Sequence, residues 1–319
     1  MKKKIYTLAL GAILLAGCSQ EEHLAIGEEV KMTFTANLSN GVQSRAENET
    51  LLANKMVVGI YEKTGEEYKL AQKEEAVDIN SNNPNLEITL IKGTTYKVVF
   101  WAYNQGNQQE APYDFNDLEA IKFKEDASNY EAFTAVSDDI IGGKATSKEI
   151  TLKRPVAQVR IGTTQEDWET AKKLGKTPTS TSVTLKDCPE SYNALTGQAS
   201  ENKTTLNFNK FEFTDPIKSF KIEEVEYYNF GTCYTFASIT RTEENGETKE
   251  TGSNITCTLK VNNKIENKEE TFFTETYNDT EVKPNYRTNI IGRLMTGITT
   301  FTVTLSDGFE EENINKNIE

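Results

Sequence analysis

The sequence predicts an all-β fold made of two sandwich domains, and three observations point to it. The chain is rich in Thr, Val, Ile, Phe and Tyr, in short runs where apolar and polar residues alternate. Such alternation is typical of strands with one buried face, and turn residues between many short strands are typical of a β-sandwich. About 300 residues after loss of an N-terminal signal suggest two domains. No period of roughly 20 to 50 residues repeats, which disfavours solenoids and propellers.

The N-terminus predicts export and a lipid anchor. Three lysines precede an apolar run from Ile5 to Gly17, which is the pattern of a secretory signal and is too short to span a bilayer. The ending Leu15-Ala16-Gly17-Cys18 resembles the bacterial lipobox, in which the cysteine thiol is acylated. We therefore expect residues 1–17 to be a lipoprotein signal peptide and Cys18 to carry acyl chains such as palmitate. The alternative is a soluble secreted protein in which this cysteine is fortuitous.

The residues after Cys18 predict a tether at the cell surface. The run Ser19-Gln20-Glu21-Glu22-His23 is polar and acidic, and it is similar to signals that send some Gram-negative lipoproteins to the outer face. No later apolar run reaches the roughly 18 residues that a membrane helix needs, so we expect the remainder to be soluble.

The first predicted strand lies within this region, which we delimit as residues 18–46. Apolar side chains occupy every second position from 30 to 38, each large one worth roughly 1.5 to 3 kcal/mol if buried. They are Val30, Met32, Phe34, Ala36 and Leu38. A polar segment follows, with one basic residue, Arg45, directly before Ala46. A strand that is expected to contribute side chains to a core is thus joined to the rest of the chain by a segment that a protease could cut.

We expect the N-terminal sandwich domain to span residues 47–162. Alternating runs predict strands at 56–62, 86–90, 96–103 and 150–161, with Pro155 at an edge or bulge because it lacks a backbone donor. The connection 111–134 reads as a loop pinned to the sandwich by apolar side chains. These are Phe115, Leu118, Ile121 and Phe123.

We expect the C-terminal domain to span residues 163–319 and to begin with the one helix. Thr163 and Glu166 form a possible capping box, and Gly175 supplies a stop. One helix face is expected to carry Trp168, Ala171 and Leu174. Strands are predicted at 181–185, 204–208, 211–214, 219–226, 231–237, 255–261, 271–277, 285–294 and 299–305, with an exposed hairpin tip at 240–253. The acidic end, 308–319, is expected to be frayed.

The sequence predicts neither an enzyme nor a metal or cofactor site. The only histidine, His23, lies in the tether, so Ser-His-Asp and Cys-His systems lack their base and zinc lacks its commonest nitrogen ligand. Paired acids such as Asp138-Asp139 read as a solvated turn. The formal net charge of −14 falls to −17 when the three lysines of the signal leave, which makes nucleic acid an unfavourable partner.

Two side-chain groups have alternative interpretations. With Cys18 acylated, Cys188, Cys233 and Cys257 can form at most one disulfide, and the alternation around Cys257 predicts that it is buried. The aromatic residues of strand 96–103 are expected to pack in the core. A sugar-stacking platform made by Tyr96, Trp101 and Tyr103 is the alternative.

Several runs, spread in order over nearly the whole chain, together resemble the fimbrillin-like subunits of the type V pili of Gram-negative bacteria. They are the lipobox, Val42-Gln43-Ser44-Arg45-Ala46, Phe100-Trp101-Ala102, Lys153-Arg154-Pro155-Val156-Ala157-Gln158-Val159, and Asn285-Tyr286-Arg287-Thr288-Asn289-Ile290-Ile291-Gly292-Arg293-Leu294. The resemblance implies two tandem transthyretin-like Greek-key sandwiches.

The resemblance also implies a maturation route. Such subunits reach the surface as outer membrane lipoproteins, and an arginine-specific protease then removes the N-terminal segment, here between Arg45 and Ala46. Loss of the strand from Val30 to Leu38 would open a groove for a strand from another subunit. The implied partners are therefore other pilus subunits, the protease, and the outer membrane through the lipid on Cys18.

Two points stay open at this stage. Stalk subunits donate a C-terminal segment, whereas residues 307–319 are acidic and poor in alternating apolar residues, which favours a tip or accessory role. The alternative function is a surface lipoprotein that binds a glycan or host ligand and does not polymerise.

Overall fold

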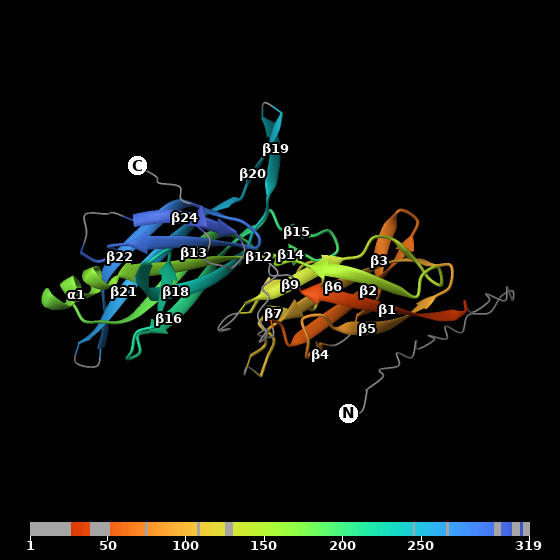
Figure 1. Ribbon diagram of the computed structural model, residues 1–319, viewed down its shortest axis with the longest axis horizontal. Coiled ribbons are helices and arrows are strands. Elements are labelled where there is room, and N and C mark those ends of the chain that lie inside the picture. The colour runs from red at the N-terminus through yellow and green to blue at the C-terminus, as the bar shows by residue number, and fades with distance from the viewer. Residues whose placement is uncertain are drawn as a thin grey trace.

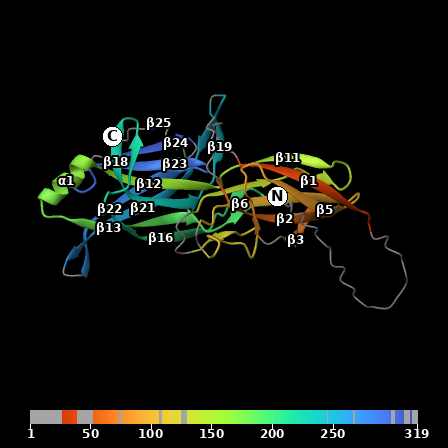
Figure 2. The ribbon, with the colours of Figure 1, turned by 60° about the horizontal axis from the view of Figure 1, so that its bottom comes forward.

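The computed structural model describes residues 27–38, 52–73, 76–106, 109–124, 130–244, 246–265, 268–296, 301–307 and 313–314. The described chain is an elongated all-β molecule in which two β-sandwiches lie end to end, as Figure 1 shows. A second view, in Figure 2, gives the same arrangement, with the one helix of the described residues at the far end of the C-terminal sandwich. The predicted all-β class is confirmed. Within the described residues, no helix has the length and apolar character needed to cross a membrane.

Two sheets form the N-terminal sandwich. The first contains, in spatial order, β11 (Ser147–Leu152), β1 (Glu29–Leu38) and β5 (Asn85–Ile91). The second contains β10 (Ile140–Ile141), β6 (Thr95–Tyr103), β2 (Lys55–Thr64) and β3 (Glu67–Lys73), with β4 (Val77–Asp78) paired to β2 and β9 (Ala132–Val136) paired to β6. Their facing side chains, Phe34, Val58 and Phe100 among them, form one buried core.

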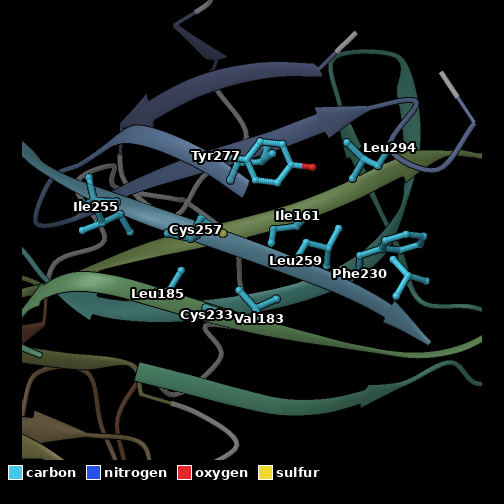
Figure 3. Packing of buried hydrophobic residues seen from close by; sticks show 14 of the residues in the cluster. Ile161, Val183, Leu185, Phe230, Cys233, Ile255, Cys257, Leu259, Tyr277 and Leu294 are labelled. Atoms are coloured by element: carbon cyan, nitrogen blue, oxygen red, sulfur yellow. The ribbon is translucent and has the colours of Figure 1, made fainter. Parts of the chain in front are cut away.

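Two larger sheets form the C-terminal sandwich. The first contains β17 (Ser219–Ile222), β18 (Val225–Phe236), β12 (Val156–Thr164), β23 (Tyr286–Gly292), β24 (Phe301–Asp307) and β25 (Asn313–Ile314). The second contains β16 (Lys203–Glu212), β13 (Pro178–Pro189), β21 (Ser253–Ile265) and β22 (Lys268–Val282). Residues such as Ile161, Phe230 and Leu259 point into the space between these sheets (Figure 3).

Three short hairpins complete the described fold. They are β7 (Tyr113–Asp114) with β8 (Lys122–Phe123), β14 (Tyr192–Asn193) with β15 (Gln198–Ala199), and β19 (Thr240–Glu244) with β20 (Glu247–Thr251). The last of these projects from the middle of the molecule (Figure 1), which confirms the exposed hairpin predicted at 240–253.

An aromatic cluster joins the two sandwiches, and we call it the junction cluster. It includes Trp101 and Tyr113 from the N-terminal half, and Tyr192 and Phe236 from the C-terminal half. Trp101 lies with its ring centroid 5.7 Å from that of Tyr192 and 6.3 Å from that of Phe236. Phe115, Leu118, Ile121 and Phe123 belong to this cluster or pack against it, as predicted for the connection 111–134.

The predicted strand 150–161 is wrong as a single strand. Residues up to Leu152 belong to β11 in the N-terminal sandwich, and Val156 begins β12 in the C-terminal sandwich. The chain crosses between sandwiches at Pro155, whose missing N–H suits an interruption of the ladder. Residue 162 lies inside β12, where it pairs with both β18 and β23.

The helix α1 (Gln165–Lys173) is capped one residue later than predicted. The Thr164 hydroxyl, not that of Thr163, accepts a hydrogen bond from the Asp167 amide, 3.2 Å away. Trp168 and Ala171 are buried as predicted, but Leu174 is 65% exposed because it follows the last helical turn.

Cys188, Cys233 and Cys257 are buried free thiols, so no disulfide joins them. Cys257 lies in the C-terminal core, as its alternation predicted, with Cys233 nearby (Figure 3).

Candidate functional site

The strand β1 lies at the centre of its sheet, and this position defines the candidate site. It pairs antiparallel with β5 from Glu29 to Thr35, and parallel with β11 from Thr33 to Leu38. The predicted strand at 30–38 is therefore confirmed with nearly the same bounds. In the described part of the chain, neither β5 nor β11 pairs with any other strand. Both outer strands thus depend on β1 for their ladder.

The buried face of β1 is the face that the alternation predicted. Met32, Phe34, Ala36 and Leu38 are buried, with Phe34 and Ala36 fully enclosed, while Val30 at the end of the strand is only partly buried. Phe34 reaches across the sandwich to Phe100 of β6, with ring centroids 5.2 Å apart.

Backbone hydrogen bonds to residues outside β5 and β11 also hold β1 in place. The amides of Ala36 and Leu38 donate to the carbonyls of Pro84 and Asn82, at 3.0 and 2.9 Å. The amide of Thr33 donates to the Thr146 carbonyl at 2.9 Å.

The solvent face of β1 carries polar side chains, two of which make polar contacts with β5. Lys31 Nζ lies 2.7 Å from Glu87 Oε1, and the Thr35 hydroxyl donates to Asn85 Oδ1 at 2.7 Å. Such exposed contacts contribute little, at most about 1 kcal/mol for the ion pair. The hold on β1 therefore comes from its buried face and its two ladders.

Both ends of the segment that carries the predicted processing site are fixed in the same core. Leu38 and, on the other side, Ala53 are buried there, and the Leu52 amide donates to Asn82 Oδ1 at 2.9 Å. Arg45 and Ala46 themselves lie outside the described residues, as does Cys18. A cut between Leu38 and Leu52 would leave β1 held by noncovalent contacts alone.

The sugar-stacking platform is wrong, because its three members are buried. Tyr96, Trp101 and Tyr103 are 4%, 0% and 1% exposed. Trp101 and Tyr103 are covered by the β7–β8 loop and by residues of the C-terminal sandwich, which come from distant parts of the sequence.

The C-terminal strand is integrated in its own sandwich. All seven residues of β24, from Phe301 to Asp307, pair with β23. Thr304 is 1% exposed and Val303 packs against the core. The described part beyond it, β25, pairs with β24 through two residues.

Sequence reasoning identified β1 but missed the strands that receive it. Nothing in the local pattern of 85–91 or 147–152 distinguishes a strand that flanks β1 from any other strand. The position of Phe100 opposite Phe34 was likewise invisible, because it depends on how the two sheets stack.

Comparison with known proteins places the chain in a family and finds a similar fold in a solved structure. No curated protein matches it. A candidate adhesin from Bacteroides thetaiotaomicron has a TM-score of 0.51 at 10% identity, with 92% of this chain and 100% of the other covered. A fimbrial assembly protein from Parabacteroides distasonis has a TM-score of 0.37 at 12% identity, with coverages of 91% and 100%. The fimbrial anchor protein Mfa2 from Porphyromonas gingivalis has a TM-score of 0.40 at 13% identity, with coverages of 90% and 100%. The model of a family of unknown function, DUF6562, matches residues 23–319, and the chain therefore belongs to the DUF6562 family.

Proposed function

We propose that this protein is a fimbrillin-like structural or accessory subunit of a type V pilus, acting at the surface of a Gram-negative cell. It is exported as an outer membrane lipoprotein acylated at Cys18. Cleavage between Arg45 and Ala46 releases β1, and a strand from another subunit then fills the vacated groove. The fold shared with the Bacteroides thetaiotaomicron candidate adhesin is compatible with this role.

The proposal rests on one observation: β5 and β11 both pair with β1 in the sheet. Because β5 and β11 have no other strand neighbour in the described chain, loss of β1 leaves two unpaired edges facing one groove. Unpaired edges are templates for strand addition.

The strands that flank the groove determine the direction and the side-chain pattern of the strand that can fill it. An incoming strand that runs antiparallel to β5 and parallel to β11 restores both ladders. It needs large apolar side chains at alternate positions, where Met32, Phe34 and Leu38 now lie. Each such side chain contributes roughly 1.5 to 3 kcal/mol, so the exchange recovers about what was lost.

The C-terminal strand supports an accessory or tip position in the pilus. Donating β24 would remove a strand that pairs along its whole length and packs on the C-terminal core. The subunit is therefore built to accept a strand, and β25 contributes only a two-residue pairing.

The test uses the unlipidated precursor, made with Cys18→Ser, and an arginine-specific protease. We expect a cut after Arg45, read by mass, with β1 retained under native conditions and released in denaturant. A synthetic peptide of residues 27–38, added in excess during release, should be taken up and should restore the stability of the N-terminal sandwich of the cleaved protein.

Arg45→Gln is the matched control, because it leaves β1 unchanged and removes the cut. Arg241 is exposed on the β19–β20 hairpin, so cleavage there is recognised by its different fragment masses and removed with Arg241→Gln. No cut at Arg45, or a cut protein whose N-terminal sandwich keeps its full stability after β1 is stripped, contradicts the proposal. Either result favours a lipoprotein that binds its ligand without polymerising.

A further inference from the structure

A cavity of about 460 Å³ opens where the two sandwiches meet, and we call it the junction cavity. Its walls come from β9, from the crossing at residues 153–155, from the β14–β15 hairpin, from the start of β19 and from Pro284-Asn285. Of these elements, β9, β14, β15 and the base of β19 lie in the middle of the molecule in Figure 1. The volume lies within the range of small-molecule sites, roughly 300 to 1,000 Å³.

The charge of the junction cavity is opposite to that of the protein. Its charged lining residues are Lys153, Arg154 and Arg241, and no described carboxylate side chain lines it. The whole chain has a formal net charge of −14. Glu131 and Glu250, which lie outside the lining, pair with Arg154 and Arg241, so the net positive charge at the site comes from Lys153. A net positive charge beside two guanidinium groups at one concave site favours an anionic ligand.

The three cations differ in how they are held. Arg154 is buried, with its Nε atom 2.9 Å from Glu131 Oε1 and its Nη1 atom 3.3 Å from Asn285 Oδ1. Arg241 is exposed and pairs with Glu250 at 2.8 Å. Lys153 is exposed and has no ion pair with any described residue. Arg154 thus shapes the wall, and Lys153 is available to a ligand. Arg241 uses its Nε atom for Glu250, which leaves its two Nη groups to meet a ligand.

The uncharged lining suits a saccharide. Ser238 and Gln198 offer a hydroxyl and an amide that make no side-chain hydrogen bond within the described residues. Apolar groups lie beside them, including Val136, Ile239 and the ring of Tyr192. Sugars present hydroxyl groups on their rim and C–H groups on their faces, and such mixed walls complement both.

We propose that the junction cavity binds an acidic saccharide, with its carboxylate held by Lys153 and Arg241. This site does not use β1, so it is independent of the pilus role. Binding is measured on the uncleaved chain, and each proposal can fail without the other.

The test is calorimetry of the full, unlipidated chain with digalacturonic acid, and with its dimethyl ester as the uncharged matched ligand. We expect the acid to bind, the ester to bind roughly tenfold more weakly, and added salt to weaken the acid only. Lys153→Gln and Arg241→Gln should each weaken the acid by roughly tenfold, because each removes a charge-assisted hydrogen bond. Arg241→Lys, which keeps the charge, should retain most of the affinity.

Lys69→Gln is the control for the change in net charge, since Lys69 is exposed on β3, away from the cavity. Thermal unfolding of each variant shows whether its fold is unchanged. Equal affinity for acid and ester, an equal effect of Lys69→Gln, or no heat of binding at millimolar ligand would overturn the proposal.

Discussion

Phe34 of β1 packs against Phe100 of β6 with ring centroids 5.2 Å apart and planes inclined at 51°. The two residues belong to opposite sheets, so this contact ties the central strand of one sheet to the middle of the other. Both side chains are fully buried. This contact lies within the core of the N-terminal sandwich.

Phe34→Ala should destabilise the N-terminal sandwich by about 3 to 5 kcal/mol, since it leaves a cavity where a whole ring was buried. Denaturant unfolding followed by tryptophan fluorescence measures the effect, with Trp101 in the junction cluster and Trp168 in the C-terminal core as the two emitters. The comparison is Lys31→Ala on the exposed face of the same strand, which should cost at most about 1 kcal/mol. Equal costs for the two would contradict the buried-face account of how β1 is held.

Asp167→Asn should destabilise the C-terminal sandwich by roughly 2 to 3 kcal/mol. The buried carboxylate accepts from the Thr163 hydroxyl at 2.7 Å and from the amides of Met295 and Thr296 at 2.8 and 3.0 Å. The substitution replaces one acceptor oxygen by an amide NH₂ group, which would face the same N–H and O–H donors and could not accept their hydrogen bonds. Thermal or urea unfolding measures the change, and Glu166→Gln, on the exposed neighbour, should be nearly neutral. A neutral Asp167→Asn would mean that the network contributes nothing.

Gly142→Ala should destabilise the N-terminal sandwich by roughly 1 to 3 kcal/mol through overpacking. An added Cβ would lie 2.1 Å from the carbonyl oxygen of Ile91, at the turn that closes β5 beside the start of β1. Gly246→Ala is the comparison, because its Cβ meets open space and its positive φ costs about 1 kcal/mol. The unfolding midpoint should therefore fall further for Gly142→Ala than for Gly246→Ala, and the reverse order would refute the steric argument.

Stability should fall as the pH rises above roughly 8.5, where unfolded thiols ionise. Burial raises the pKa of Cys188 to about 11 and that of Cys257 to about 12, and it raises the pKa of Cys233 well above its ordinary value. Between roughly pH 8.5 and those values, the unfolded chain loses protons that the folded chain keeps. The free energy of unfolding therefore decreases, by at most about 1.4 kcal/mol per pH unit and thiol.

Urea midpoints of the Cys18→Ser chain, measured from roughly pH 7.5 to 9.8, test this prediction below the ordinary tyrosine pKa. Cys188→Ala should make the decrease of the free energy of unfolding with pH less steep, whatever its effect on stability at neutral pH. The pH dependence is set only by the groups that titrate, and this substitution removes one of them. A slope that is unchanged by this substitution would show that the thiols do not cause it.

Local patterns predicted the elements well and their partners poorly. The bounds and buried face of β1 follow from alternation within ten residues. Its parallel pairing with β11 joins residues more than a hundred positions apart, and no local signal encodes that. The division of the predicted strand 150–161 between two sandwiches had one visible sign, Pro155, since alternation continues on both sides of it.

The remaining differences have tertiary causes. By sequence Thr163 is the better cap, because Glu166 completes a capping box with it, but Thr163 is buried and its hydroxyl reaches Asp167 and the Gly292 carbonyl. That leaves Thr164 to cap the helix. The junction cavity could not be predicted either, because it is assembled from five separate segments that meet only in the folded chain.

The junction cluster also makes the molecule stiff. Bending one sandwich against the other would have to separate Trp101 from Tyr192 and Phe236, and an interface of packed rings resists such motion. We therefore expect the two halves to move together, so that a pull applied to the N-terminal sandwich would reach the C-terminal sandwich instead of being absorbed by a hinge.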